Sequence, residues 1–475
     1  MGIVVNHFSF ALHFKKVTTK TKPANHDSSL TVFAYAVAGL GHLRVTDALY
    51  DGMPSGNRAI ILDSLDKSLE DIHRFTSTHL AARSLMDWLQ AGPLSLTFAH
   101  LYRFSLRSRP QKTYNQVRTI LSSAKHNPKK LLFIATHFGL AHQLAAVKQK
   151  LEIDFNTQIS LVVVVTDDTF HPIWYVKGAD LIVVPSLKTK QRFINYSCFI
   201  GDHVPIKVLS YPVSPALSLS LNSKQIKDKV NQTIPEQKDH IHVLIPISGA
   251  AVGTQYFLRL IDTLKSFSPR YFFHVVSKSA PYTHTFLSRL VKRESVELAV
   301  SPVDREVVDL YDRLFRKEVF SLEITKPSEQ AFKALLQPVS RGGVILLLSE
   351  PVGPQEKDNL DFLVRHLLVP TPSLNHKLWQ MAEEGVRLDT RTDPLFSSAC
   401  TWRGICLPEN PFQSARFIHW MLNQRLFYHM LLCKNLPDKS DPHPEELGTD
   451  GVKQFWQLIA KTFNSNSASK TPPLH

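Results

Sequence analysis

Residues 30–49 have the sequence LTVFAYAVAGLGHLRVTDAL, in which an apolar run precedes a glycine-containing turn and a stretch with helical spacing. The run from Leu30 to Ala38 predicts a strand. Gly39 and Gly41 predict a tight turn, and residues Leu43 to Leu49 predict a helix. A strand, a glycine turn and a helix open many α/β domains that handle nucleotides. This segment therefore predicts an α/β fold.

Short apolar runs recur along the rest of the chain, each bounded by polar or helical segments. Continuous runs of Val, Ile and Leu are typical of strands buried on both faces of a parallel sheet. In the first half they lie at Leu131–Ala135, Ile159–Thr166, Leu181–Pro185 and Lys207–Leu209. In the second half HVLIPISG (242–249) opens another strand, glycine and helix unit, and further runs lie at Tyr271–Ser277, Glu297–Val300 and Gly343–Ser349. We expect two Rossmann-like lobes whose parallel sheets face a central cleft.

The domain boundaries follow from length and composition. A chain of 475 residues exceeds what one hydrophobic core usually fills. Between Tyr211 and His240 the sequence is rich in Pro, Ser, Asn, Gln and Lys and lacks apolar periodicity, which predicts a linker. We expect an N-terminal extension (1–29), a first lobe (30–215), a linker (216–240), a second lobe (241–410), C-terminal helices (411–463) and a disordered tail (464–475).

The composition is that of a globular protein with a basic surface. The formal net charge of +14 favours contact with polyanions, either nucleic acid or acidic lipid headgroups, and no nucleic-acid-binding motif is found. The four cysteines lack zinc-ligand or CxxC spacing, so we expect no disulfide scaffold and no metal cluster, with Cys400 and Cys406 as packed thiols. This use of cysteine predicts a protein of the reducing cytoplasm, and the absence of a run of about 18 apolar residues predicts that the chain does not span a membrane.

Two glycine turns are candidate anion sites. Gly39 and Gly41 precede His42 at the start of one predicted helix, and Gly249 and Gly253 precede Thr254 at the start of another. Amides at a helix N-terminus favour a phosphate, and His42 would then point into the cleft. The alternative is a tight turn with a surface histidine.

The segment VVVVTDDTFHPIWYVKGADLIVVPSLKTKQRF (162–193) resembles a stretch of the processive diacylglycerol glucosyltransferase and monogalactosyldiacylglycerol synthase family, MurG-like glycosyltransferases of the GT-B fold. Ile324-Thr-Lys-Pro327 is similar to the ITKPGG turn of that family, and residues 353–359 are similar to its PGQExxN segment. His42 falls on the histidine of the family's GGGH turn. In the quoted segment the matching residues are Thr166, Asp167, His171, Pro172, Trp174, Asp180, Pro185 and Ser186.

The resemblance implies a GT-B fold and an inverting sugar transfer from a nucleotide donor, UDP in the family, to a membrane lipid such as diacylglycerol. It implies no metal or other cofactor, since the nucleotide sugar is a substrate. His42 is the candidate base or diphosphate partner, and Asp167 would orient it or the acceptor. The candidate donor-binding residues are Gly249, Gly253, Thr254, Lys326, Glu329, Gln355, Glu356 and Asn359. The alternative for Gln355, Glu356 and Asn359 is a solvated helix start.

The chain departs from the family in the ITKP turn. Ser328 and Glu329 stand where the family has two glycines, and Ala334 stands where it has the glutamate expected to hold the donor ribose. We expect Glu329 to take over the ribose contact from the opposite end of the turn. The alternatives are a donor other than a UDP-sugar and an inactive site.

Residues 95–130 combine apolar side chains with a collar of Arg and Lys, including Arg103, Arg107 and Arg109. Such a segment can insert into lipid headgroups while its cations neutralise anionic lipid. The alternative is an amphipathic helix packed on the first lobe. The acceptor and membrane candidates also include Gly39, Gly41, His137, His171 and Trp174. His137 and His142 could line the acceptor cleft, but a histidine on a half-apolar helix is more often a structural residue.

Two rival functions remain open on the sequence. A UDP-sugar 2-epimerase also uses two Rossmann-like lobes, and a degenerate GT-B protein would bind a nucleotide sugar or a lipid without catalysis. The expected partners are thus a nucleotide sugar, a lipid acceptor and an anionic membrane surface at the inner face of the membrane, with no nucleic acid. The sequence leaves the oligomeric state open.

Overall fold

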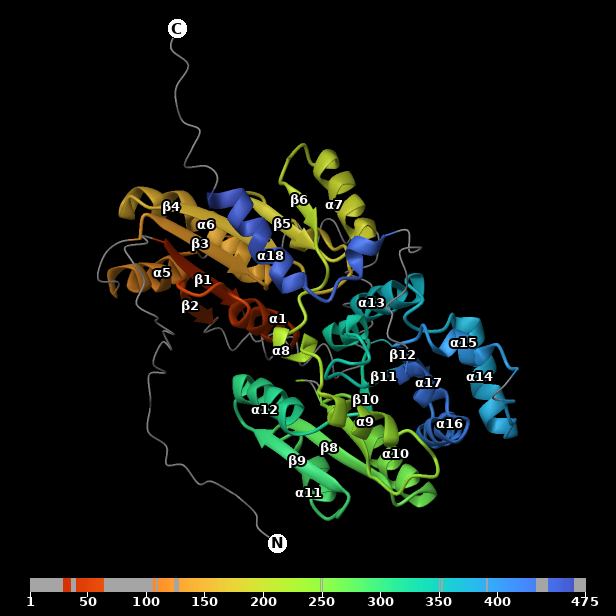
Figure 1. Ribbon diagram of the computed structural model, residues 1–475. Helices are drawn as coiled ribbons and strands as arrows, with labels where there is room; N and C mark the ends of the chain where they lie inside the picture. Colours follow the sequence, from red (N-terminus) through yellow and green to blue (C-terminus); the bar gives the residue numbers. More distant parts are fainter. Residues whose placement is uncertain are drawn as a thin grey trace.

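The computed structural model describes residues 29–35, 40–63, 106–107, 110–123, 128–247, 249, 251–349, 351, 353–389, 392–432 and 443–464. Within these ranges the strands form two six-stranded sheets with parallel pairing throughout. Each sheet carries helices, and the two lobes lie against each other (Figure 1). The predicted α/β class with two Rossmann-like lobes, the arrangement of the GT-B fold, is confirmed. Almost all of the predicted extension (1–29) and tail (464–475) lie outside the described residues.

The first lobe contains the sheet β2-β1-β3-β4-β5-β6. Its first and third strands pair in register from Ser29 opposite Lys130 to Ala34 opposite Ala135. The strands are β1 (Ser29–Tyr35), β2 (Arg58–Asp63), β3 (Lys130–Ala135), β4 (Gln158–Val164), β5 (Leu181–Val184) and β6 (Ile206–Val208). The helices are α1 (Leu40–Asp51), α5 (Gln111–Ser123), α6 (Phe138–Phe155), η1 (Pro172–Trp174) and α7 (Leu187–Phe199).

The second lobe contains the sheet β12-β11-β10-β7-β8-β9, which is the Rossmann strand order read from its far edge. The order reverses between β7 and β10, and ligands of such sheets bind outside the carboxyl ends of the strands at this point. The strands are β7 (Ile241–Pro246), β8 (Tyr271–Lys278), β9 (Val296–Ser301), β10 (Leu322–Thr325), β11 (Val344–Leu348) and β12 (Gly404–Leu407). The helical segments are α10 (Thr254–Phe267), α11 (His284–Leu290), α12 (Asp304–Lys317), η2 (Glu329–Leu335), α13 (Pro354–Arg365), α14 (Pro372–Glu384), α15 (Leu395–Ala399), α16 (Pro411–Asn423) and α17 (Leu426–Leu432).

Three of the strands, β2, β10 and β12, were not predicted by the apolar runs of the sequence. The reason is clearest in β10, whose sequence LEIT contains Glu323. This glutamate is fully buried and is paired with Lys333 of η2. A buried charge is tolerated only when it is paired, and the partner of Glu323 lies eight residues beyond the end of the strand, so an apolar pattern does not reveal this strand.

The segment predicted as a linker contains two short helices, α8 (Pro215–Ser218) and α9 (Ser223–Asn231). The Lys229 side chain on α9 is buried, and its Nζ donates hydrogen bonds to the carbonyl oxygens of Pro338 (2.8 Å) and Ser340 (2.9 Å) in the second lobe. Burial lowers the pKa of Lys229 to about 7. Part of the predicted linker is therefore anchored to the second lobe.

The C-terminal part of the chain returns to the first lobe. After α17 come η3 (Pro444–Glu446), α18 (Gly451–Ile459) and η4 (Ala460–Asn464). The Trp456 indole donates a hydrogen bond of 2.9 Å to the carbonyl oxygen of Leu49 on α1, and its ring packs edge-on against Phe33 of β1. In Figure 1 α18 accordingly lies on the first sheet, apart from α16 and α17 on the second lobe.

The apolar core continues across the boundary between the lobes. One buried cluster combines Phe33 and Ile134 of the first sheet with Leu244 and Ile345 of the second. At the boundary Tyr211 and Phe332 stack with a ring separation of 3.8 Å and an angle of 1°. A shared core of this kind stabilises one relative placement of the lobes, since separating them would expose apolar surface to water.

Two sequence expectations about covalent and membrane structure can be compared with the structure. Cys400 is disulfide-bonded, which corrects the expectation of a packed thiol, whereas Cys198 and Cys406 are free. The sequence pattern failed here because pairing depends on distance in space and not on spacing along the chain. Among the described helices, none has the length and apolar character needed to cross a membrane.

Candidate active site

The backbone of His42 is fixed at the first turn of α1, beyond the carboxyl end of β1. Its carbonyl oxygen accepts hydrogen bonds from the hydroxyl groups of Thr46 (2.8 Å) and Thr136 (3.1 Å), and these two hydroxyls are 2.7 Å apart. Thr136 follows β3, so the neighbouring strand holds the histidine in place. The structure therefore presents His42 at the edge of the first sheet that faces the second lobe.

The His42 side chain lies among three residues that the sequence analysis had selected. Its Nδ1 is 3.2 Å from the hydroxyl of Thr166, which follows β4. Its ring packs edge-on against His137 at 5.2 Å and lies 5.9 Å from the ring of Trp174. The predicted residues around His42 thus do come together, although they are spread over more than one hundred positions of the sequence.

Asp167 is joined to this group through Thr166. The Thr166 hydroxyl lies 3.4 Å from Asp167 Oδ2, and Asp167 Oδ1 accepts a hydrogen bond of 2.8 Å from Asn359. Burial raises the pKa of Asp167 to about 7, and the nearby carboxylates of Glu329 and Glu356 act in the same direction. A carboxyl group with a pKa near neutrality can both accept and release a proton at physiological pH.

Asn359 on α13 connects the two lobes at this point. It is fully buried, and its Oδ1 accepts a hydrogen bond of 2.7 Å from the Asp168 amide. Its Nδ2 donates to Asp167 and also to the carbonyl oxygen of Pro327, 3.2 Å away. The side chain predicted for donor binding therefore links the strand end that carries Asp167 to the ITKP turn.

Glu329 also reaches across to the first lobe. Its Oε1 is 2.5 Å from Nη1 of Arg44, which lies two residues after His42 in α1. A Cβ atom at Gly41 would lie 2.9 Å from Glu329 Oε2, so a side chain at this position would require the glutamate to shift. Burial opposes ionisation of Glu329, but Arg44 and neighbouring hydrogen bonds outweigh it and lower its pKa. The ribose contact of Glu329 stays a prediction.

The remaining donor candidates lie at the carboxyl ends of β7, β10 and β11. Gly253 has a φ of 84° and immediately precedes α10, which starts at Thr254 and has no side-chain cap. The carbonyl oxygen of Gly249 accepts a hydrogen bond of 2.9 Å from Tyr282. Lys326 and Glu356 form an ion pair of 3.6 Å, and Gln355 lies in the first turn of α13. These residues surround the point where the strand order of the second sheet reverses.

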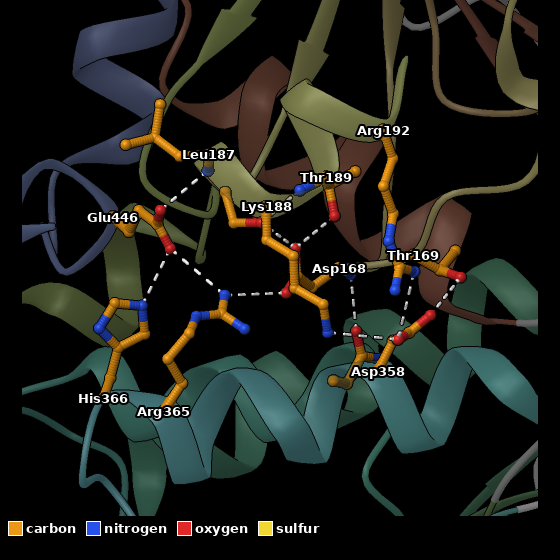
Figure 2. Close-up of polar contacts among 12 residues, drawn as sticks. Asp168, Thr169, Leu187, Lys188, Thr189, Arg192, Asp358, Arg365, His366 and Glu446 are labelled. Carbon is orange, nitrogen blue, oxygen red and sulfur yellow. Dashed lines mark hydrogen bonds and ion pairs between the residues drawn. The ribbon is translucent and has the colours of Figure 1, made fainter. Parts of the chain in front are cut away.

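A second polar contact between the lobes was missed by the sequence analysis. Figure 2 shows Asp168 and Thr169 of the first lobe facing Asp358 and Arg365 on α13. Thr169 donates a hydrogen bond of 2.8 Å to Asp358, and Arg365 lies 3.1 Å from Asp168. Lys188 and Arg192 of α7 approach Asp358 at 3.6 and 4.0 Å. The two consecutive aspartates after β4, Asp167 and Asp168, can be seen in the sequence, but the sequence does not indicate which residues of the second lobe they contact.

The C-terminal segment completes this contact. Glu446 is fully buried, and one of its oxygens accepts a hydrogen bond of 2.8 Å from the Leu187 amide at the start of α7. The other oxygen lies 2.9 Å from His366 and 3.4 Å from Arg365 (Figure 2). One carboxylate thus joins the first lobe, α13 and the returning chain.

The residues predicted to bind the acceptor or the membrane do not all lie in one place. His171 Nδ1 accepts a hydrogen bond of 3.2 Å from Ile173, and Trp174 is buried next to His42. His142 is buried 2.8 Å from the carbonyl oxygen of Ile173. Arg107 donates to the carbonyl oxygen of Lys177 at 2.5 Å. Gly39, Arg103 and Arg109 lie outside the described residues, and the described part of the chain contains no group of His, Cys, Asp and Glu arranged to hold a metal ion.

Comparison with known proteins gives structural likenesses only. No family model matches the chain, and no curated protein sequence is similar to it. Similar solved structures include MnaA from S. aureus with UDP (10% identity, 94% of this chain and 100% of that one, TM-score 0.46) and MurG from Acinetobacter baumannii (10%, 91% and 99%, TM-score 0.42). A UDP-GlcNAc 2-epimerase from Neisseria meningitidis bound to UDP-GlcNAc is 11% identical, covers 91% of this chain and 100% of its own, and has a TM-score of 0.46. At such low identities and TM-scores, these likenesses assign no substrate and no reaction to this chain.

Proposed function

We propose that this protein is a glycosyltransferase that transfers a hexose from a nucleotide donor, UDP-linked as the sequence resemblance implies, to a hydroxyl group of a membrane lipid such as diacylglycerol. The observation that supports the proposal most is the contact chain from His42 through Thr166 to Asp167. It lies at the carboxyl ends of the first sheet, where the second lobe closes over it. A histidine oriented by polar neighbours is a suitable base for an acceptor hydroxyl.

In this mechanism the first lobe provides proton transfer. His42 accepts the proton of the acceptor hydroxyl as its oxygen attacks the anomeric carbon on the face opposite the leaving diphosphate, which inverts the configuration. The Thr166 hydroxyl, 3.2 Å from His42 Nδ1, holds the ring orientation. Asp167 stabilises the positive charge that develops on the imidazole, and it does so only when it is ionised.

The second lobe provides the leaving-group site. The uncapped start of α10 presents backbone amides at Thr254 and the residues after it. Amides at a helix N-terminus and the helix dipole favour a diphosphate. Lys326 supplies a cation, while Gln355 and Glu356 bind hydroxyl groups of the sugar. Glu329 exchanges its contact with Arg44 for the donor ribose when the donor binds.

Donor binding can be measured directly by titration calorimetry with UDP and UDP-hexoses. We expect the wild type to bind, and Glu329→Ala to weaken binding by about tenfold or more, because a hydrogen bond to a charged group contributes about 1.5 to 3 kcal/mol. The matched control is Glu384→Ala, which removes an exposed carboxylate at the end of α14 and leaves the affinity unchanged. If the wild type binds no nucleotide sugar, the proposed function is wrong.

If the acceptor is a membrane lipid, we expect the protein to bind anionic vesicles. In the described part of the basic segment, α5 exposes Lys112 and Arg118, while Leu106 is buried in the first lobe. We expect the protein to bind phosphatidylglycerol vesicles, to release them as salt is raised, and to bind more weakly after Lys112→Glu and Arg118→Glu are combined. The same charge change at Lys224 and Lys227, both exposed on α9, is the control. Equal binding to neutral phosphatidylcholine vesicles contradicts the prediction.

A second candidate is an epimerase that changes the nucleotide sugar without an acceptor. The observation that favours it is that the two lobes are in contact next to His42, through the ion pair of Arg44 with Glu329 and the hydrogen bond of Asn359 with Asp167. Lobes held in contact suit a reaction with one substrate. Incubation of UDP-GlcNAc with the protein and no lipid separates the candidates, since only an epimerase converts the sugar, as read by proton NMR.

A further inference from the structure

Arg44 is a largely buried cation at the boundary between the lobes, with no role in the proposed mechanism. It lies on α1, and 15% of its side chain is exposed. Its Nη1 is 2.5 Å from Oε1 of Glu329, whose side chain is 14% exposed. Glu329 begins η2 two residues after the ITKP turn, which contains Lys326. Arg44 therefore meets the second lobe beside residues that are proposed to bind the donor.

The hydrogen-bonding capacity of the Arg44 guanidinium group is only partly used. Its Nε is buried and has no hydrogen-bond partner among the described residues. Its central carbon lies over the Tyr311 ring, 5.0 Å from the ring centre, which supports one face of the group. A buried donor without an acceptor is unfavourable, because it has lost its hydrogen bonds to water. A ligand that brings an oxygen acceptor to Nε would remove this cost.

The exchange of partners proposed for Glu329 leaves a charge uncompensated. The ribose hydroxyl groups that Glu329 would contact are neutral and cannot replace it as a counter-ion of Arg44. Arg44 would then be a largely buried cation without a partner, which is strongly unfavourable. Lys326, the cation proposed for the second lobe, already has a counter-ion in Glu356, 3.6 Å away. A ligand that separates Glu329 from Arg44 must therefore supply an anion of its own.

We propose that Arg44 binds the diphosphate of the nucleotide-sugar donor, and that it does so as Glu329 moves to the ribose. The inference rests on the proposed function and adds a cation from the first lobe to the leaving-group site. During transfer the bond from the anomeric carbon to the diphosphate oxygen breaks, and its electron pair stays on that oxygen. The acceptor oxygen bonds to the carbon, and its proton passes to His42. Arg44 stabilises the negative charge that the leaving diphosphate gains, through charge-assisted hydrogen bonds.

Titration calorimetry of the full chain with UDP and with uridine separates the diphosphate contact from the ribose contact. We expect Arg44→Gln to weaken UDP binding by about tenfold or more, because charge-assisted hydrogen bonds to the diphosphate are lost. Uridine should bind to this variant at least as tightly as to the wild type, because Glu329 no longer has a competing partner. A purely structural role of Arg44 would instead weaken the binding of both ligands.

The matched control is Arg305→Gln. Arg305 also joins the lobes, through an ion pair of 2.6 Å with Asp47, and 30% of its side chain is exposed. We expect this variant to change the affinities for UDP and uridine by the same factor, because the loss of an ion pair between the lobes affects both ligands alike. Circular dichroism and the melting temperature show whether each variant folds.

A measurement on the wild type keeps the proposal falsifiable if Arg44→Gln does not fold. The Nε–H group of Arg44 gives one NMR signal in protein labelled with ¹⁵N-arginine, and this signal is assigned by its loss in Arg44→Lys. We expect it to move downfield with UDP and not with uridine, since only UDP brings an anionic acceptor to Nε.

The outcomes separate this proposal from the proposed function. If the wild type does not bind UDP, the proposed function fails and the role of Arg44 fails with it. If UDP binds, the role of Arg44 alone is overturned by any of three results. These are an unchanged UDP affinity in Arg44→Gln, an equal loss of UDP and uridine affinity in that variant, and an Nε–H signal that does not respond to UDP.

Discussion

Replacing His42 with alanine is expected to lower sugar transfer by about 10²- to 10⁴-fold, the usual contribution of a general base. The fold should persist, because the hydrogen bonds that the His42 carbonyl oxygen accepts from Thr46 and Thr136 are kept in the variant. Initial rates with saturating donor measure the loss, and circular dichroism and the melting temperature measure the fold. An unchanged rate in His42→Ala would remove this residue from the mechanism.

The control for this variant is His376→Ala, which removes an exposed histidine on α14 and leaves the rate unchanged. The pH profile gives a second test of the contact chain. Burial raises the pKa of Asp167 to about 7, so the carboxyl group is protonated at lower pH and cannot support a charged His42. We therefore expect the rate to rise as the pH increases through about 7, and the rate should be lower and its dependence on pH altered in Asp167→Asn, which has no carboxyl group at this position.

Replacing Glu446 with alanine is expected to destabilise the protein by about 3 to 5 kcal/mol, the usual result of removing one member of a buried ion pair. The variant leaves His366 and Arg365 without their carboxylate and the Leu187 amide without its acceptor. Chemical unfolding measured by fluorescence gives the free energy. Because these contacts join both lobes to the C-terminal segment, we also expect the two lobes of the Glu446→Ala variant to unfold separately.

Glu445→Ala is the matched control, since the neighbouring side chain is exposed, and it should change the free energy of unfolding little. The sign of the pH dependence follows from the pKa of Glu446. Burial would raise it, but hydrogen bonds from His366 and the Leu187 amide and the charge of Arg365 lower it below the ordinary value of 4.5. Its stabilisation is thus present above about pH 4.5 and is lost as the pH falls through the lowered pKa. Equal stability of the Glu446→Ala variant and the wild type would show that the contact contributes nothing.

Much of the fold was visible in local patterns. The apolar runs predicted β1, β3, β4, β5, β7, β8 and β11 within a few residues, because strands buried on both faces exclude polar side chains. Gly253 marked the turn before α10, whereas Gly41, predicted in the turn before the first helix, lies in the first turn of α1, and Gly39 lies outside the described residues. The same patterns failed for β10, where the buried Glu323 is balanced by a lysine outside the strand.

The candidate site was only partly visible. The glycine turns, the residue types at strand ends and the family resemblance together pointed to His42, His137, Asp167, Trp174 and Asn359, and the structure brings them together. The contact of Glu329 with Arg44 spans 285 positions, and that of Asp168 with Arg365 spans 197. The apolar periodicity of a single sequence gives no information about pairs of residues that are so far apart along the chain.

The sequence by itself determined the two α/β units, since each depends on apolar spacing and turn residues within a few dozen positions. The tertiary structure alone decided how the lobes meet and which of the carboxylates are paired across them. The physical reason is that ionisation and pairing depend on burial and on distances in space, and these exist only once the lobes have packed together.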